Sequence, residues 1–274
     1  GVEERRGFVQ LTGEIGTGKT LMLDALVAEL DATTRVMRLS HTTVDDVGLL
    51  RILGGQLGVG GASKPELLAG IENALCELVG AGRNAVFVVD EAQNLSLIVL
   101  EEIRLLSNLR CEGRQAMQII LAGQPELRRK LEFRAVRQLR QRIGIRHHLT
   151  TLTRAETGAY IRHRLEVAGA AETGLFDRGA VEAIYEYSGG IPRVVNTVCD
   201  QSLLVGYAEN RRRIGRALVG EAIRSIEGRE LRKAEASVSS DAGESEAAPV
   251  GSVGSGRSRA RWALTAATLV ALGV

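Results

Sequence analysis

The sequence predicts an α/β fold: a five-stranded parallel sheet sandwiched by helices, followed by a small all-helical domain. Short apolar runs alternate with longer amphipathic segments as far as Leu149, and the runs AVFVV and IILA are apolar throughout. Strands buried on both faces have this composition, and a helix between successive strands is the connection that parallel pairing needs. After Arg154 the helical pattern continues without a convincing strand. These observations give the fold class.

The strands are expected at the short apolar runs and the helices at the segments that join them. We expect the strands at Phe8–Thr12, Arg35–Ser40, Ala85–Asp90, Gln118–Ala122 and Ile145–Leu149. We expect the helices at Lys19–Leu30, Val44–Leu57, Pro65–Val79, Ser96–Leu109 and Pro125–Leu131. Because strands and helices alternate, the helices are expected to cover both faces of the sheet.

The second domain is expected to consist of helices alone. We expect these at Arg154–Ala168, Arg178–Tyr187, Pro192–Glu209 and Ala217–Glu227. Gly189 and Gly190 end one helix, and Pro192 stands at the favoured first turn of the next. We therefore expect an α/β domain over residues 1–152 and a helical lid domain over 153–228. The sequence starts at Gly1 without an initiator Met or a signal peptide, so we expect the first domain to be truncated at its N-terminus.

A flexible linker is expected over residues 229–260, because ASVSSDAGESEAAPVGSVGSG has no aromatic residue and few large apolar ones. The apolar run from Trp262 to Val274 follows three arginines. It is shorter than the roughly twenty residues of a membrane span, and alone it also fits a buried or interfacial helix. With the arginines and Trp262 at its start, we expect 261–274 to begin a single transmembrane helix, with the preceding domains in the cytoplasm.

The composition argues against a nucleic-acid-binding surface. The formal net charge is +2, and aromatic residues make up 3% of the chain. A near-neutral balance gives no strong attraction to phosphates, and few aromatics are available for stacking on bases. The three cysteines Cys76, Cys111 and Cys199 match no zinc or redox spacing, so we expect buried thiols in a reducing compartment.

The segment GEIGTGKT fits the phosphate-binding pattern G-x-x-x-x-G-K-[ST] between an expected strand and an expected helix. Glycines allow successive backbone N–H groups to surround an anion, and the helix N-terminus adds partial positive charge. Lys19 is expected to contact the β- and γ-phosphates, and Thr20 to bind Mg²⁺. We expect the nucleotide to be bound by Gly13, Glu14, Ile15, Gly16, Thr17, Gly18, Lys19, Thr20 and Leu21.

Two carboxylates, Asp90 and Glu91, follow the buried run AVFVV. Because carboxyl ends of parallel strands share one edge of the sheet, we expect both beside the phosphate-binding loop. Asp90 is expected to hold Mg²⁺ through water, and Glu91 to polarise the attacking water. An acidic pair after a strand is also a common solvated strand end or helix cap. The phosphate-binding motif upstream favours the catalytic interpretation.

Further motifs extend from about Arg5 to Tyr207: RRGFVQLTGEIGTGKT, VVDEAQNL, ILAGQPEL, LRQRI, TRAETGAYIRHRLEVAG and SGGIPRVVNTVCDQSL. With these stretches the chain resembles AAA+ ATPases of the general secretion pathway protein A type. Relatives of that group are associated with pilus biogenesis and exosortase-linked polysaccharide export. The resemblance implies a P-loop NTPase fold with ATP and Mg²⁺ as cofactors, and a homo-oligomer or ring.

The resemblance also implies three accessory residues. Gln124 takes the place of the residue that senses the γ-phosphate, although a polar residue before Pro125 also suits a helix start. Arg142 is expected to be the arginine finger, with Arg140 as the alternative; both lie in an Arg-rich stretch where a solvated basic face is the ordinary interpretation. Arg193 corresponds to the sensor-2 arginine of the lid.

The expected function is Mg²⁺-dependent ATP hydrolysis by an ATPase tethered to the inner membrane, serving assembly or export of an envelope structure with a secretion-system protein as partner. The alternative is a DNA-associated AAA+ ATPase of the transposition-regulator type. Against it stand the net charge and the absence of a helix-turn-helix signal; the basic patch RRRIGR fits a helix end better than a phosphate track. A non-hydrolysing nucleotide switch is disfavoured because Glu91 is present.

Overall fold

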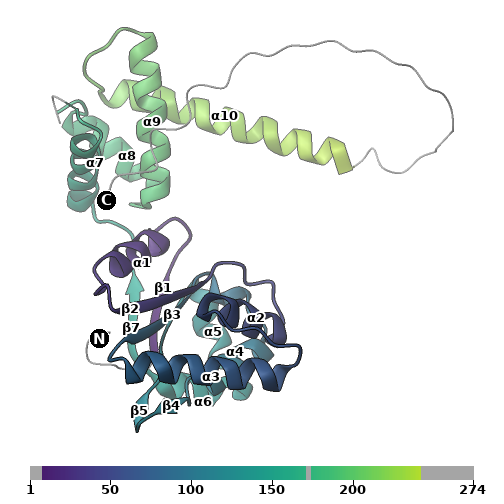
Figure 1. Ribbon diagram of the computed structural model, residues 1–274. Helices are drawn as coiled ribbons and strands as arrows, with labels where there is room; N and C mark the ends of the chain where they lie inside the picture. Colours follow the sequence, from purple (N-terminus) through teal and green to yellow (C-terminus); the bar gives the residue numbers. More distant parts are fainter. Residues whose placement is uncertain (1–7, 171–173, 242–274) are drawn as a thin grey trace, which may run out of the picture. The chain divides into compact units, whose positions relative to one another are not determined.

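The computed structural model describes residues 8–170 and 174–241 (Figure 1). The chain divides into two compact units, Gly1–Thr151 and Leu152–Val274. The first unit has two clusters of buried apolar side chains and the second unit has one. We call them the first and the second unit.

A five-stranded sheet forms the centre of the first unit, with every pair of neighbouring strands parallel. Its strands are β1 (Phe8–Gly13), β2 (Thr34–Leu39), β3 (Asn84–Val89), β6 (Gln118–Gly123) and β7 (Ile143–Leu149). The spatial order is β2-β3-β6-β1-β7. The parallel sheet predicted from the apolar runs is confirmed, and β6 separates β1 from β3.

Helices cover both faces of this sheet (Figure 1). They are α1 (Lys19–Ala28), α2 (Asp46–Leu57), α3 (Lys64–Gly80), η1 (Ala92–Asn94), α4 (Leu97–Leu106), α5 (Pro125–Lys130), η2 (Arg134–Val136) and α6 (Arg137–Arg142). Alternation along β3 shows the two layers: Phe87 belongs to the large core shared with α2, α3 and α4, whereas Val88 belongs to the smaller core under α1. The expected two-sided cover is therefore present.

Side-chain caps start three of these helices where the chain leaves a loop. Asp45, Ser63 and Ser96 each accept a hydrogen bond from a backbone N–H in the first turn of α2, α3 and α4 respectively. Such a cap stabilises a helix by about 1 kcal/mol, because it satisfies an N–H that has no partner within the helix.

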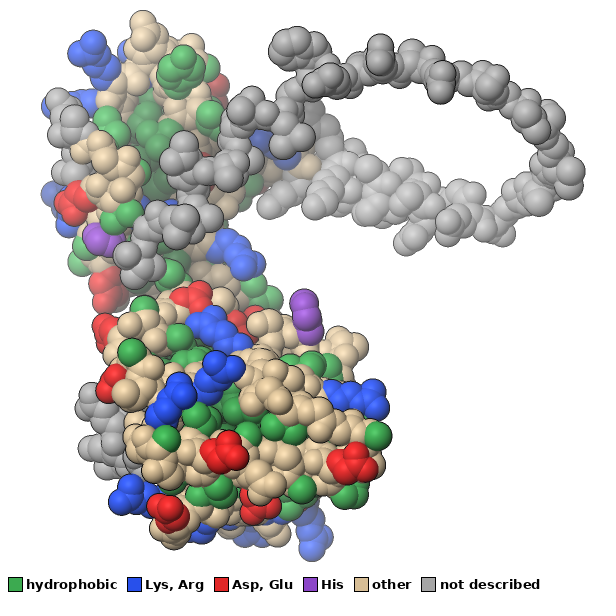
Figure 2. Space-filling view, viewed as in Figure 1, with side chains coloured by type: hydrophobic (Ala, Val, Ile, Leu, Met, Phe, Trp, Pro, Cys, Tyr) green, Lys and Arg blue, Asp and Glu red, His purple; other side chains and the backbone are tan. Residues whose placement is uncertain are grey.

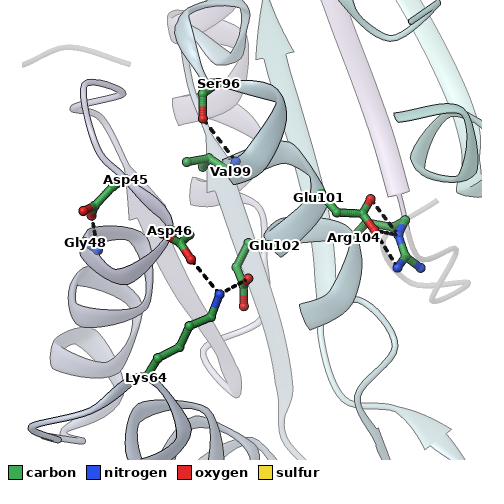
Figure 3. A network of polar contacts seen from close by, with 9 residues as sticks. All are labelled: Asp45, Asp46, Gly48, Lys64, Ser96, Val99, Glu101, Glu102 and Arg104. Carbon is green, nitrogen blue, oxygen red and sulfur yellow. Dashed lines mark hydrogen bonds and ion pairs between the residues drawn. The ribbon is translucent and has the colours of Figure 1, made fainter. Parts of the chain in front are cut away.

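A partly buried ion cluster joins α2, α3 and α4 (Figure 3). Lys64 Nζ donates to Asp46 Oδ2 at 2.6 Å and to Glu102 Oε2 at 2.7 Å. Only 5% of the Glu102 side chain is exposed, and its Oε1 has no hydrogen-bond partner. The hydrogen bond from Lys64 holds the pKa of Asp46 below its usual value. Lys64 therefore compensates a carboxylate that the core would otherwise bury without a partner.

The cysteine expectation is wrong for two of the three residues. Cys76, on α3, and Cys111 form a disulfide between residues 35 positions apart. Cys111 belongs to a small hairpin, β4 (Arg110–Cys111) and β5 (Arg114–Gln115), that the sequence analysis did not predict. This hairpin brings Cys111 against α3. Cys199 is a free thiol, and burial, followed by the charge of Asp200, raises its pKa to about 12.

The second unit consists of α7 (Arg154–Val167), α8 (Arg178–Ser188), α9 (Pro192–Ala208) and α10 (Arg216–Asp241). Thr153 and Glu156 form a reciprocal capping box at the start of α7. The core of the unit includes Ile161, Ile184 and Val195, one each from α7, α8 and α9. An isolated bridge between Phe176 and Ile214 adds to the helices.

Helix α10 corrects part of the linker expectation. It continues to Asp241, so residues 229–241, expected to be flexible, are helical. The sequence RELRKAEA explains this, because Glu, Leu, Arg, Lys and Ala all favour helix. The rest of the expected linker and the expected start of a transmembrane helix, 261–274, lie outside the described residues. Within residues 8–170 and 174–241, no helix has both the length and the apolar character that a membrane crossing requires.

Replacement of Lys64 by Met is expected to lower the free energy of unfolding by about 2 kcal/mol at pH 7, because Glu102 stays buried without its cation. This value is below that for a fully buried pair, since Lys64 is 35% exposed. Urea titration followed by circular dichroism measures it. Arg51→Met, on an exposed position of α2, is the control and should change stability by less than about 0.5 kcal/mol.

The difference in stability between wild type and Lys64→Met should also depend on pH. The pKa of Asp46 is lower in the folded chain than its ordinary 3.8, so its contribution is fully present above that value and is lost as the pH falls through the folded pKa. The stability difference between wild type and Lys64→Met should therefore shrink below about pH 4. A difference that is constant from pH 7 to pH 3 would contradict this account.

Candidate nucleotide-binding and catalytic site

The loop from Gly13 to Gly18 joins β1 to α1 and has a backbone that needs glycine. Gly16 and Gly18 have φ angles of 81° and 95°, in a region that side chains disfavour. Gly13 is crowded instead: a Cβ there would lie 2.8 Å from both Leu149 O and Thr17 Oγ1. Thr17 closes the loop by donating its hydroxyl to Glu14 O at 2.8 Å. Glycine is thus required where the motif predicts a close approach of the backbone to an anion.

Lys19 lies inside this loop. Its side chain is 5% exposed, and Nζ donates to Gly13 O at 2.9 Å and to Glu14 O at 3.0 Å. The ammonium group therefore adds its positive charge to the partial positive charge of the α1 N-terminus, beside the same loop. Ile15 and Leu21, also expected in the site, are 57% and 52% exposed.

Thr20 and Asp90 meet across the sheet edge, although they are 70 residues apart in sequence. Thr20 Oγ1 donates to Asp90 Oδ2 at 2.7 Å. Asp90 directly follows β3, and Thr20 belongs to the first turn of α1. A hydroxyl and a carboxylate side by side are the oxygen ligands that Mg²⁺ prefers. The donor set therefore fits a magnesium ion held by Thr20 and Asp90 beside the phosphate-binding loop.

Glu91 has a left-handed backbone, with φ 50° and ψ 36°, which is uncommon for a residue with a side chain. Its N–H donates to Asp90 Oδ1 at 2.9 Å, so the two acidic residues are locked together. Gln124 Nε2 lies 3.3 Å from Glu91 Oε2, within hydrogen-bonding reach. The structure thus places Gln124, which follows β6, against the carboxylate expected to act on water.

Gln93 is a site residue that the sequence analysis missed. Its Nε2 donates to Glu91 Oε2 at 2.5 Å, and its Oε1 accepts from the backbone N–H of Gln124 at 3.0 Å. Lys130 Nζ donates to the backbone carbonyls of Gln93 and Leu95. The signal was present in DEAQNL, where a polar residue follows Glu91 two positions later, but only the fold brings the end of β6 against it.

The expected arginines lie away from this cluster or in the other unit. Arg142 Nη1 donates to Ser107 Oγ at 3.1 Å, just before β7 begins and therefore at the sheet edge opposite the loop. Arg140 is exposed, and its carbonyl accepts from Arg146. Arg193 is exposed in the first turn of α9, in the second unit. Their roles toward a nucleotide stay predictions.

Gly190 fixes the turn that precedes Arg193 within the second unit. Leu152 N–H donates to Gly190 O at 2.8 Å, and a Cβ on Gly190 would lie 1.9 Å from Leu152 O. With its φ of 75°, this position accepts only glycine. The turn is thus held against the start of the unit.

The arrangement in the first unit suits phosphoryl transfer to water. It combines an anion cradle with a buried ammonium, an oxygen pair that fits Mg²⁺, and a carboxylate held by two amides. Positioning and charge stabilisation are what phosphoryl transfer requires of a protein. No group of His, Cys, Asp and Glu within the described ranges has the arrangement of an all-protein metal centre.

Comparison with known proteins gives a matching family model and a curated relative. Residues 2–131 match the model described as an AAA domain. The chain is 35% identical over 217 residues to General secretion pathway protein A of Aeromonas hydrophila, a match that covers 78% of this chain. It covers 40% of that protein, so the chain spans less than half the length of this relative.

Solved structures share the fold at low sequence identity. The ORC2 protein of Aeropyrum pernix has a TM-score of 0.58 and 16% identity, over 80% of this chain and 61% of that one. Cdc6p of Pyrobaculum aerophilum has a TM-score of 0.58 and 19% identity, over 76% of this chain and 57% of that one. The RuvB Holliday junction branch migration motor of Thermotoga maritima has a TM-score of 0.53 and 18% identity, over 80% of this chain and 61% of that one. These likenesses show the fold alone.

Gly18→Ala is expected to weaken nucleotide binding by about 10-fold or more, because alanine disfavours φ 95° and the loop would lose its inward N–H groups. Titration with a fluorescent ADP analogue measures the affinity. Gly82→Ala is a matched control: its φ is 73°, its Cβ would also meet no atom within 4 Å, and it lies between α3 and β3. Equal affinities for the two variants would contradict the role of the loop.

Proposed function

We propose that this chain is an AAA ATPase of the general secretion pathway protein A type and that it hydrolyses ATP with Mg²⁺ at the edge of its parallel sheet. The observation that carries the proposal is the convergence of three strand ends on one site. Lys19 follows the loop after β1, Asp90 and Glu91 follow β3, and Gln124 follows β6.

Binding is assigned to the loop and to α1. The backbone of Gly13–Thr20 would surround the phosphates, and Lys19 would neutralise charge between the β- and γ-phosphates. Thr20 and Asp90 would hold Mg²⁺, which supplies charge neutralisation of the phosphate oxygens when bound. Two glycines with φ above 80° and a lysine already directed into the loop support this assignment.

Glu91 is assigned the catalytic base. It would orient the attacking water and accept its proton, and Gln124 would read the state of the γ-phosphate from the neighbouring strand. The hydrogen bond from Gln124 to Glu91 supports this division of work, because it connects the two side chains directly.

Oligomerisation would complete the site. Arg142 lies at the opposite sheet edge from the loop of its own chain, a position that supports a role toward the nucleotide of another copy. We assign it, or the exposed Arg140, as the arginine that a neighbouring copy supplies, and Arg193 as the lid arginine. An arginine supplied in this way contributes roughly 10³–10⁵-fold to phosphoryl transfer.

The proposed biological role is to power or regulate assembly or export of an envelope structure in a secretion, pilus or polysaccharide system, with a secretion-system protein as partner. The identity to General secretion pathway protein A supports it. We propose attachment to the inner membrane by a single C-terminal helix that begins near Arg261, with the ATPase domain in the cytoplasm; Arg257, Arg259 and Trp262 in the sequence support this topology.

The alternative role at DNA has less support. The likeness to RuvB and Cdc6p concerns the fold, at identities below 20%. On the face of the first unit visible in Figure 2, basic and acidic side chains are interspersed, in keeping with the net charge of +2. A protein that follows DNA phosphates needs a coherent basic track.

Glu91→Gln is expected to lower ATP turnover by at least about 100-fold while ATP binding is retained, because the amide keeps the shape of the carboxylate and cannot accept the proton. Phosphate release measures turnover, and equilibrium titration with a fluorescent ATP analogue measures binding. Glu112→Gln, in the turn between β4 and β5, is the control. Unchanged turnover in Glu91→Gln would refute the assignment.

In cells that carry the natural full-length protein, we expect it to sediment with membranes and to resist extraction by high salt. Deletion of residues 261–274 together with the apolar residues that continue the run should release it. Immunoblots of the two fractions measure this. A protein found in the soluble fraction, or one that binds duplex DNA with strong salt dependence, would favour the alternative role.

A further inference from the structure

We propose that Gln93 is a positioning residue for Glu91: its side-chain amide holds the carboxylate in the orientation that faces the attacking water. This inference rests on the proposed function, because it concerns the residue assigned as the base. Gln93 itself would touch neither the nucleotide nor the water. Its effect on catalysis would pass through Glu91.

The contact between the side chains of Gln93 and Glu91 is short. Gln93 Nε2 lies 2.5 Å from Glu91 Oε2, whereas Gln124 Nε2 lies 3.3 Å from the same oxygen. Both amides therefore converge on Oε2, and no described residue donates to Oε1. A carboxylate pinned at one oxygen presents the other in a fixed direction. Gln93 makes the closer of the two contacts.

The side chain of Gln93 is itself fixed at its other end. Its Oε1 accepts the backbone N–H of Gln124 at 3.0 Å, so the amide spans the gap between the ends of β3 and β6. Gly123 makes room for this, since a Cβ there would lie 2.6 Å from Gln93 Oε1. Lys130 holds the backbone of Gln93 from α5. An amide fixed on both sides can position a third group.

Glu91 needs such a constraint because of its backbone. Its φ of 50° turns the chain away from the direction of β3, and residues with a side chain adopt this conformation at an energetic cost. This conformation places Glu91 at the N-cap of the short turn η1, which contains Gln93 two residues later, and the two side chains meet there. Strained backbone held by side-chain hydrogen bonds is typical of sites that depend on orientation.

A positioning role and a purely structural role for Gln93 predict different results for the substitution Gln93→Glu. Gln93→Glu keeps the length of the side chain and an oxygen that can accept the Gln124 N–H. It removes the donor to Glu91 and places a second carboxylate beside it. Gln93→Met removes both contacts at nearly the same volume. Gln115→Met, on β5 in the small hairpin, is the matched control.

The experiment measures kcat and KM for ATP in the presence of Mg²⁺, together with the melting temperature, for the full chain and each variant. We expect kcat to fall roughly 10- to 100-fold in both Gln93→Glu and Gln93→Met, the range of one hydrogen bond to a charged group. KM should stay within about twofold, because the ATP-binding groups are untouched. The control should match wild type.

Each of the following results would overturn the proposal. If Gln93→Glu keeps wild-type kcat while Gln93→Met loses it, Gln93 serves only to hold the backbone at Gln124. If kcat, KM and melting temperature all deteriorate together, Gln93 is a structural residue. Glu91→Gln, measured alongside, distinguishes failure of the proposed function from failure of this inference. If that variant retains turnover, Glu91 is not the base, and this inference is refuted with it. An inactive Glu91→Gln with a fully active Gln93→Glu refutes this inference alone.

Discussion

The order of the parallel strands is the constraint on which the site depends. Because β6 lies between β1 and β3, the ends of three strands are neighbours at one edge, although they are far apart in sequence. The phosphate-binding loop, the acidic pair and Gln124 each follow one of these strands directly. An antiparallel neighbour would place one of the three groups at the opposite edge. The proposed site thus depends first on the strand order, because no single side chain could form it without its neighbours at the same edge.

Backbone conformation then sets the direction of the groups at that edge. Gly16 and Gly18 have positive φ angles that turn the loop inward, and Glu91 has one that turns its side chain off the line of β3. Hydrogen bonds hold both arrangements: Lys19 to the carbonyls of its own loop, and Gln93 to Glu91. The large core around α2, α3 and α4 packs against the sheet that carries these turns, and Lys64 joins the three helices.

Much of the fold and the central residues of the candidate site could be predicted from the sequence. The ends of each expected strand lie within two residues of the ends of the observed strand. A continuous short apolar run between two helices is typical of a buried parallel strand. Local motifs indicated Lys19, Thr20 and Asp90 as candidate site residues, and the fold brings Thr20 and Asp90 into contact. What local signals could not supply were contacts that depend on tertiary structure. The disulfide required knowledge that a hairpin packs on α3, and Gln93 required knowledge that β6 ends beside η1. The extension of α10 over residues 229–241 was not expected, because the linker-like composition farther along the chain outweighed the helix propensity of RELRKAEA.

The central claim is that one sheet edge binds Mg²⁺ and ATP and presents Glu91 to water. A crystal structure of the full chain with Mg²⁺ and a non-hydrolysable ATP analogue tests it most directly. We expect the metal against Thr20 Oγ1 and Asp90, the γ-phosphate beside Lys19 Nζ, and a water between that phosphate and Glu91, with the amide of Gln93 still on the Glu91 carboxylate. A nucleotide bound elsewhere on the chain, or a Glu91 directed away from the phosphates, would contradict the account.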